Sequence, residues 1–289
     1  MHPWLSGPLT TETLTISIAG LPSHLSGLVV TQLSDLHYDG LRLSDALLDE
    51  AIACSNGHNP DLVVLTGDHI TDQPDPAPEL ARRLAHLKAK AGVYAILGNH
   101  DLYYVKTRSA ITSALEAVNI RVLWNEVCYP WGEGLALVGL ADYWSREFCT
   151  APLETVPADT PRLVLSHNPD SAASLQPHRV DLQLSGHTHG GQIILPGLGP
   201  LPQWYQHLRQ RTPAWLRPYI PYMRRDCHKV VKHWEWAQGL HRVGQNRLYV
   251  NRGLGTYPPG RLLCPPELTV IRLVAASVAA QAADAAAAR

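Results

Sequence analysis

Five short motifs rich in Asp, Asn and His lie in the first two thirds of the chain: SDLH at 34–37, GDH at 67–69, GNHD at 98–101, SH at 166–167 and GHTH at 186–189. Their carboxylate oxygens and imidazole nitrogens are donors that suit Mn, Fe or Zn, and the lack of thiolate argues against a structural zinc site. Pairs such as Asp35 with His37, or His187 with His189, are spaced so that both side chains can point to one side and chelate. The motifs therefore predict a metal centre.

Each motif alone has a structural interpretation. An Asp after a strand often caps a helix, a single His is usually satisfied by packing, and Gly-Asn is a common turn. Five such motifs in one chain, each following an apolar run, are hard to explain in that way. We therefore predict that seven side chains form one centre: Asp35, His37, Asp68, Asn99, His167, His187 and His189.

The elements around the first three motifs repeat a pattern of short apolar run, polar turn and amphipathic stretch, which is typical of βαβ units. The runs are LVVTQL, DLVVLT and GVYAIL. Helices are predicted at 43–56, with Ser44 as N-cap and Gly57 as the stop, at about 78–90 and at about 107–118. Because ligands gather at the carboxyl ends of strands in α/β sheets, the motifs can meet in space.

Further strands are predicted at RVLW, LALVGLAD, PRLVLSH, VDLQLSGHTH, RLYVNRG and ELTVIRLV. These are more strands than one parallel sheet with covering helices needs. The sequence thus predicts an α/β fold in which two mixed sheets pack face to face with helices outside, a four-layer sandwich. We expect one domain over 1–274, followed by an Ala-rich tail at 275–289 that is a frayed helix or disordered.

Composition restricts the classes of protein to which the chain could belong. The formal net charge of −1 gives no global argument for a polyanionic partner. The five cysteines form no C-x-x-C pair, so a disulfide framework is not expected. The chain has neither a leader pattern nor 18 consecutive apolar residues, which predicts a soluble, cytoplasmic protein.

Residues 201–236 interrupt the alternation of strands and helices. This insertion holds seven Lys or Arg, two acids and four of the eight Trp; the interleaved residues include Trp204, Trp215, Trp234, Trp236, Arg209, Arg211, Arg217, Arg224 and Arg225. A self-packed cap, an interfacial element that binds anionic membrane or acyl chains, and a nucleic-acid surface are the alternatives. No nucleic-acid recognition module is visible, so no nucleic-acid partner is expected.

The motifs D-x-H, G-D, G-N-H-D, H and G-H-x-H, in this order, resemble the calcineurin-like metallophosphoesterase superfamily. The segments SHNPD, SGHTHGGQI and YVNRGLGTYPPGRLLCPPEL resemble a bacterial phosphodiesterase subgroup that includes a UDP-2,3-diacylglucosamine pyrophosphatase of lipid A synthesis. The resemblance implies two sheets between helices and two divalent metal ions, with Mn expected first and Fe or Zn as alternatives.

The resemblance also implies a role for each residue. Asp35, His37 and His189 would hold one ion; Asn99, His167 and His187 the other; and Asp68 would bridge them. His100 would lie beside the ions as a catalytic residue, with Asp101 orienting its ring. His69 is expected to pack in the interior or to line the pocket. Arg252 is the favoured candidate to bind a phosphate oxygen, and Arg261 is a weaker one.

The expected activity is hydrolysis of a phosphodiester or pyrophosphate bond, with UDP-2,3-diacylglucosamine as the specific substrate favoured. The alternatives are a nucleotide or cyclic-nucleotide phosphodiesterase and, from another class, a scaffold that keeps the fold without the chemistry. A lipid substrate would be met at the inner face of the membrane, where the 201–236 insertion could make peripheral contact.

Overall fold

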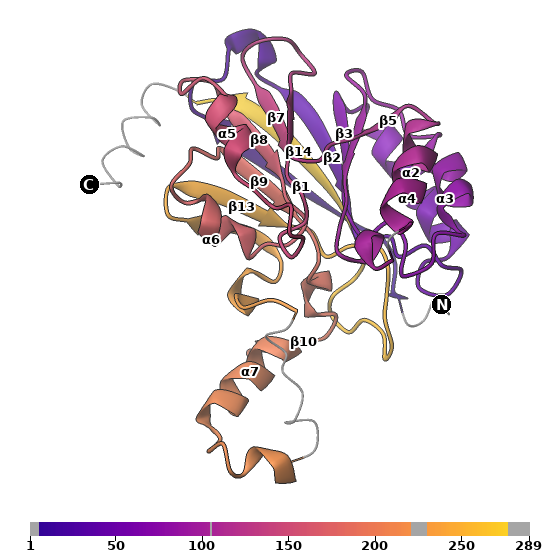
Figure 1. Cartoon of the computed structure of the whole chain (residues 1–289), viewed down its shortest axis with the longest axis vertical. Coiled ribbons are helices and arrows are strands. Elements are labelled where there is room, and N and C mark those ends of the chain that lie inside the picture. The colour runs from indigo at the N-terminus through magenta and orange to yellow at the C-terminus, as the bar shows by residue number, and fades with distance from the viewer. Residues whose placement is uncertain (1–5, 105, 221–229, 277–289) are drawn as a thin grey trace.

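The computed structural model describes residues 6–104, 106–220 and 230–276 and contains two six-stranded sheets (Figure 1). The first sheet has the order β1 (Thr10–Ile18), β14 (Glu267–Ala275), β2 (Leu28–Leu33), β3 (Leu62–Thr66), β4 (Val93–Ile96) and β5 (Ile120–Val122). The second has the order β12 (Gly239–Val243), β13 (Asn246–Val250), β9 (Leu182–Ser185), β8 (Arg162–Leu165), β7 (Ala136–Gly139) and β6 (Glu126–Cys128).

Both sheets are mixed, as predicted. In the first, the β14–β2 pair is antiparallel and the other pairs are parallel. In the second, the edge strands β12 and β6 run antiparallel to their neighbours, and β13, β9, β8 and β7 are parallel. A small hairpin, β10 (Ile194–Leu195) with β11 (Gly199–Pro200), lies outside both sheets.

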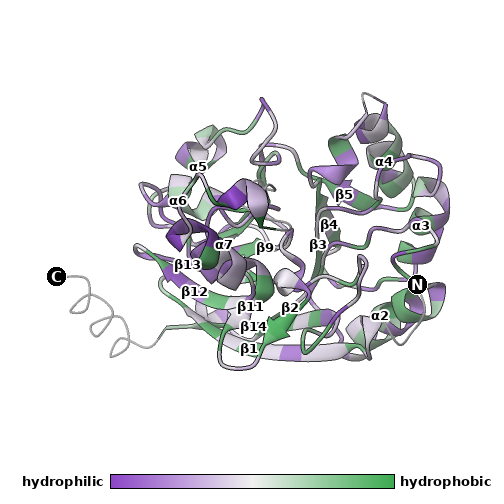
Figure 2. Cartoon of the chain, turned by 90° about the horizontal axis from the view of Figure 1, so that it is seen from below, coloured by the Kyte–Doolittle hydropathy of each residue, from purple (hydrophilic) through white to green (hydrophobic). Residues whose placement is uncertain are grey.

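Helices cover the outer face of each sheet (Figure 2). Those on the first sheet are α2 (Asp45–Gly57), α3 (Ala77–Leu84) and α4 (Thr107–Glu116), and those on the second are α5 (Ala151–Thr155) and α6 (Ser171–Leu175). Short 3₁₀ turns are η1 (Ser23–Leu25), η2 (His100–Leu102), η3 (His189–Gly191), η4 (Arg217–Tyr219) and η6 (Trp234–Trp236). The predicted four-layer sandwich is confirmed.

Alternating side chains on the strands explain the layers. Val30 of β2 and Val64 of β3 belong to the core between the sheets, whereas Val63 packs in the core under the helices of the first sheet. On β8, Leu165 faces the inner core and Val164 the core beneath α5 and α6. Since successive strand residues point to opposite faces, strands covered on both sides read as continuous apolar runs.

The three predicted helices are present, but their ends differ from the predicted ones. Ser44 caps α2 by accepting a hydrogen bond from the Leu47 amide, and the helix ends at Gly57. The helix predicted at 78–90 is shorter, because α3 ends at Leu84 and the chain continues in turns. The edge strands β1, β6 and β12 are not among the predicted strands; on β1 and β12, half-exposed polar positions weaken the apolar signal.

The insertion has its own short helix, α7 (Leu201–Arg211), which has no buried residue and projects from the sandwich in Figure 1. Residues 221–229 of the insertion, including Arg224 and Arg225, lie outside the described residues, as do 277–289 of the predicted tail. Ala275 of that tail instead ends β14. No helix within the described ranges has the length and apolar character to cross a membrane.

Candidate metal centre

The five motifs follow strand ends and meet at one edge of the sandwich. Backbone bonds fix neighbouring loops in pairs: the Asp35 amide donates to the Gly67 carbonyl at 3.0 Å, and the Gly186 amide to the His167 carbonyl at 3.0 Å. The buried Gln32 side chain crosses between the sheets and donates to the Ser185 carbonyl at 3.0 Å. The predicted convergence of the strand ends is therefore present.

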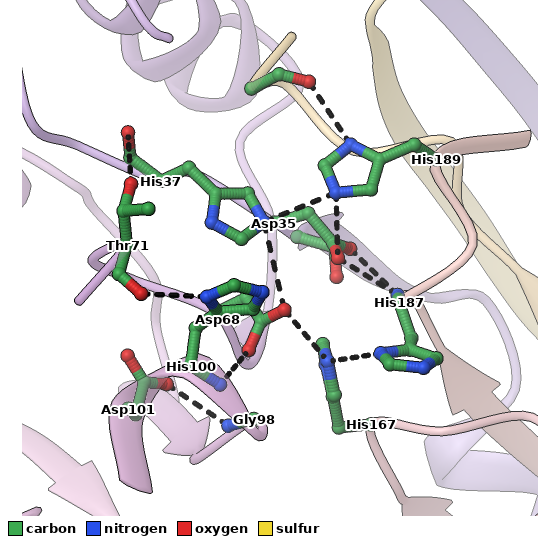
Figure 3. Close-up of polar contacts among 12 residues, drawn as sticks. Asp35, His37, Asp68, Thr71, Gly98, His100, Asp101, His167, His187 and His189 are labelled. Carbon is green, nitrogen blue, oxygen red and sulfur yellow. Dashed lines mark hydrogen bonds and ion pairs between the residues drawn. The ribbon is translucent and has the colours of Figure 1, made fainter. Parts of the chain in front are cut away.

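Two sets of side chains lie within ligand distance of one another around Asp68 (Figure 3). In one set, His189 Nε2 lies 3.1 Å from His37 Nε2 and 3.6 Å from Asp35 Oδ1. In the other, His167 Nε2 is 3.1 Å from Asp68 Oδ2 and 3.2 Å from His187 Nδ1.

Asp68 joins the two sets, since the same Oδ2 lies 3.6 Å from His37 Nε2. The structure therefore brings together six of the seven predicted ligands: Asp35, His37 and His189 form one set and Asp68, His167 and His187 another, and a third set of His37, Asp68 and His100 connects them.

The seventh predicted ligand, Asn99, follows β4 at the same edge. Its side-chain oxygen is buried and has no hydrogen-bond partner among the described residues. A buried amide oxygen left without a partner loses the stabilisation of a hydrogen bond, and a cation can supply the missing interaction. This atom and the oxygen and nitrogen donors around it fit a centre of divalent ions.

Each ligand imidazole uses its remaining ring nitrogen for a hydrogen bond. The pairs are His37 Nδ1 with Tyr257 Oη at 3.1 Å, His167 Nδ1 with the Thr66 carbonyl at 2.7 Å, His189 Nδ1 with the Gly255 carbonyl at 3.1 Å, and His187 Nε2 with the Val230 carbonyl at 2.9 Å. A carbonyl accepts only from a protonated nitrogen, so the other nitrogen of a neutral ring in this position, as at His187 and His189, keeps its lone pair toward the centre.

The backbone at this edge adopts a conformation that non-glycine residues rarely use. The φ angles are 50° at Asp35, 44° at His37, 54° at Asp68, 71° at His187 and 51° at His189. Such left-handed conformations are unfavourable and persist where surrounding contacts impose them. Here the strain turns two side chains of each D-x-H and H-x-H motif toward the same point.

Burial sets the charge state of most imidazoles. It lowers the pKa of His37 and His189 to about 3 and that of His187 to about 4. These rings are neutral near pH 7, which is the form that binds metal.

The pair of His167 and Asp68 behaves differently. Burial disfavours the charge on both groups, but their mutual attraction raises the pKa of His167 to about 10 and holds that of Asp68 well below its ordinary value. Without metal, the pair shares one proton close to His167. A cation bound at His167 would displace that proton.

The structure corrects the expected role of Asp101. Its carboxylate accepts from the Gly98 and His69 amides at 2.9 Å and contacts His69 Nδ1 at 2.8 Å, so it ties the GDH loop to the GNHD loop. The His100 ring instead places Nδ1 2.6 Å from the Thr71 carbonyl. Among the described contacts, the Thr71 carbonyl orients the His100 ring and Asp101 does not.

The two arginines near the NRGLG turn have structural partners. Arg252 pairs with Glu12 at 2.7 Å and with Glu267 at 3.2 Å, which corrects the expectation that its guanidinium grips a phosphate oxygen. Arg261 is partly buried and donates to backbone carbonyls of the same loop, including that of Gly255 at 2.6 Å. His69 packs in the interior, as favoured, and its Nδ1 is held by Asp101.

Sequence reasoning missed two residues at the centre. Tyr257 lies in the loop after β13 and contacts His37, and Asp142 lies buried after β7. The signal for Asp142 is present in LALVGLAD, where an acid follows an apolar run as it does in the metal motifs. Tyr257 has no such signal, because it lies seven residues after the end of β13 and two residues beyond the NRGLG turn.

Comparison with known proteins agrees with this geometry. A sequence model described as calcineurin-like phosphoesterase matches residues 28–191, more than half of the chain. Phosphodiesterase YaeI of Escherichia coli is 32% identical over 84% of this chain and 80% of its own length. Metallophosphoesterase YkuE of Bacillus subtilis is 32% identical over 91% and 85%, and UDP-2,3-diacylglucosamine pyrophosphatase LpxG of Chlamydia trachomatis is 27% identical over 86% and 84%.

Proposed function

The chain belongs to the calcineurin-like phosphoesterase family and is a hydrolase, and from this premise we propose that it cleaves a phosphodiester or pyrophosphate bond at a centre of two divalent ions. The observation that carries the proposal is the position of Asp68, whose Oδ2 lies 3.6 Å from His37 Nε2 and 3.1 Å from His167 Nε2. Asp35, His37 and His189 would hold one ion, and Asn99, His167 and His187 the other. The donor set suits Mn, which we take as the expected metal, ahead of Fe and Zn.

The side chains have complementary tasks in this reaction. Bound divalent ions supply Lewis acidity to the phosphoryl oxygens and lower the pKa of a nucleophilic water. Asp68 places a negative charge between the two cation positions and so offsets their repulsion. His100 donates a proton to the leaving oxygen from Nε2, while Nδ1 stays fixed on the Thr71 carbonyl.

The experiment is metal analysis combined with hydrolysis of bis(4-nitrophenyl) phosphate under Mn. Asp68→Asn should lose bound metal and activity together, whereas Asp159→Asn, at an exposed site before β8, should keep both. A wild-type protein that binds no divalent ion and hydrolyses no phosphoester would favour the scaffold alternative and reject the proposal.

For the substrate, we propose UDP-2,3-diacylglucosamine. Two observations support it: the similarity to LpxG of Chlamydia trachomatis, whose name carries that substrate, and the exposed insertion beside the site, which suits a lipid. A nucleotide or cyclic-nucleotide diester is the alternative. A substrate screen under Mn that contains all three classes, with product analysis of which bond is cut, separates them.

We further propose that the insertion contacts an anionic membrane on the cytoplasmic side. Trp215 is 73% exposed and Tyr219 80% exposed. Residues 201–220 contain three arginines and no acid. Aromatic side chains with Arg suit the membrane interface, where rings enter the headgroup layer and the cations attract anionic lipid.

The test replaces Trp215 and Tyr219 with Ser; because both side chains are exposed, we expect the remainder of the fold to stay intact. Co-sedimentation with phosphatidylglycerol vesicles should fall, with phosphatidylcholine vesicles as the reference and the exposed Tyr129→Ser as the matched control. Equal sedimentation of the double variant and the wild type would reject this contact without affecting the proposed chemistry.

A further inference from the structure

A cavity of about 430 Å³ opens beside the second ligand set. The residues that line it include Asn99, Tyr104, Arg108, Trp124, Asp142 and Trp144. It adjoins the centre through Asn99, a predicted ligand, and through Trp144, whose ring meets that of His187 edge to face at 4.8 Å. A group attached to a phosphorus atom at the centre can therefore extend directly into this cavity, which has the size of a small-molecule site.

The cavity contains a buried carboxylate with an unused oxygen. Asp142 is 1% exposed. One of its oxygens accepts from the Trp144 amide at 2.9 Å, and the other, Oδ1, has no partner among the described residues. Burying an unpaired carboxylate oxygen is unfavourable, so a ligand that donates a hydrogen bond to it gains the full benefit of the pairing.

The walls of the cavity are aromatic. Trp144 and Tyr104 are each 47% exposed. The Arg108 guanidinium lies over the Trp124 ring at 4.0 Å, and Glu147 accepts from both at 2.7 Å, so this side is fixed before any ligand arrives. Planar rings stack on exposed aromatic faces, which is how proteins hold nucleobases irrespective of their sequence.

We propose that this cavity is the subsite for the nucleoside of a nucleotide-containing substrate. The base stacks on the aromatic walls formed by Tyr104 and Trp144, and Asp142 Oδ1 accepts a hydrogen bond from an N–H of the base. An acyl chain fits less well because Asp142 would stay unpaired, and a free anion is disfavoured by Asp142 and Glu147. The inference rests on the proposed function, since that function places the phosphorus at the metal centre.

The test compares inhibitors of bis(4-nitrophenyl) phosphate hydrolysis by the Mn-loaded protein. The four ribonucleoside 5′-monophosphates, ribose 5-phosphate and inorganic phosphate are titrated in turn. The tightest nucleotide should inhibit at a concentration about tenfold or more below that of ribose 5-phosphate, because only the nucleotide carries a base to stack. Equal inhibition by ribose 5-phosphate and by every nucleotide would overturn the inference.

Two variants test whether Asp142 and Tyr104 contribute to base binding. Asp142→Asn removes the unused acceptor but keeps the shape, and Tyr104→Ala removes one aromatic wall; each should reduce the preference for nucleotide over ribose 5-phosphate by about fivefold to tenfold. Asp159→Asn, at the opposite end of β8, should leave that preference unchanged. An unchanged preference in both cavity variants, with the metal content of wild type, would overturn the assignment.

A failure of the proposed function has a different signature. If the wild type hydrolyses no phosphoester, calorimetric titration of the Mn-loaded protein with the same nucleotides and ribose 5-phosphate still measures the base preference. Retained preference without hydrolysis would support the subsite and reject the enzyme, whereas hydrolysis without preference would do the reverse.

Discussion

The close approach of two loops at the metal centre leads to a sharp prediction for Gly98→Ala. A Cβ placed on Gly98 would overlap the Asp68 carboxylate and lie 2.6 Å from the Asp68 amide nitrogen. Ordinary van der Waals contact begins at about 3.4 Å, so one loop must retreat by roughly 0.8 Å. Gly98 is not among the described glycines with positive φ, which makes the effect steric rather than conformational.

The expected result is a large loss of turnover with a moderate loss of stability. Displacing the Asp68 carboxylate, which we propose to bridge the two ions, by nearly 1 Å should lower kcat/KM for bis(4-nitrophenyl) phosphate by about 10²-fold. Overpacking of this kind should lower the free energy of unfolding by about 1–3 kcal/mol. Bound metal, kcat/KM and thermal unfolding are measured on the same preparation.

The matched control is Gly57→Ala. Gly57 ends α2, has open space around its hypothetical Cβ and is likewise not among the glycines with positive φ. This variant should keep wild-type activity and gain about 0.5–1 kcal/mol of stability, because alanine restricts the unfolded chain. A folded Gly98→Ala protein with two bound ions and wild-type kcat/KM would refute the reasoning about the bridging carboxylate.

Three further predictions follow from the surroundings of the ligands. His100→Ala should keep its metal and lose about two to four orders of magnitude in kcat on an alkyl diester, with a smaller loss on a nitrophenyl diester that needs no proton; equal losses would contradict a proton donor. Tyr257→Phe removes the partner of His37 and should weaken the affinity for one of two Mn ions by about 10–100-fold in calorimetry, whereas a uniform loss at both sites would contradict this placement. In the metal-free protein, three candidate ligand imidazoles have pKa values lowered to about 3 or 4 from an ordinary 6.5, while His167 keeps its proton. The stability that these three rings contribute above pH 6.5 is therefore lost as the pH falls from 6.5 toward 4. His187→Gln should reduce that slope by about one proton, or about 1.4 kcal/mol per pH unit, in denaturant titrations; an unchanged slope would show that this ring titrates normally.

The sequence predicts the fold well and brings the candidate ligands to strand ends, for a physical reason. Strands buried on both faces read as unbroken apolar runs, and the ligands directly follow them, so DLVVLT places Asp68 without any knowledge of tertiary structure. Edge strands lack this signal: β1 is half exposed along most of its length, and only its pairing with β14 identifies it.

The partners of the ligands could not be predicted in the same way. The rings of His167, His189 and His187 donate to backbone carbonyls, and a backbone carbonyl carries no residue type that a sequence pattern could reveal. The error about Asp101 has a similar origin. An acid that directly follows His100 in the sequence cannot easily face its ring when both lie in the 3₁₀ turn η2, so its carboxylate reaches His69 instead.

The insertion contacts the candidate metal centre through hydrogen bonds that the sequence could not predict either. Asp170 of SHNPD accepts from the backbone amides of Lys232 and His233 at 2.7 and 3.1 Å, and the His187 ring contacts the Val230 carbonyl. The return of the insertion is thus held by the same strand-end loops that carry the ligands. The bond from the His187 ring to the Val230 carbonyl therefore couples the position of this candidate ligand to that of the insertion.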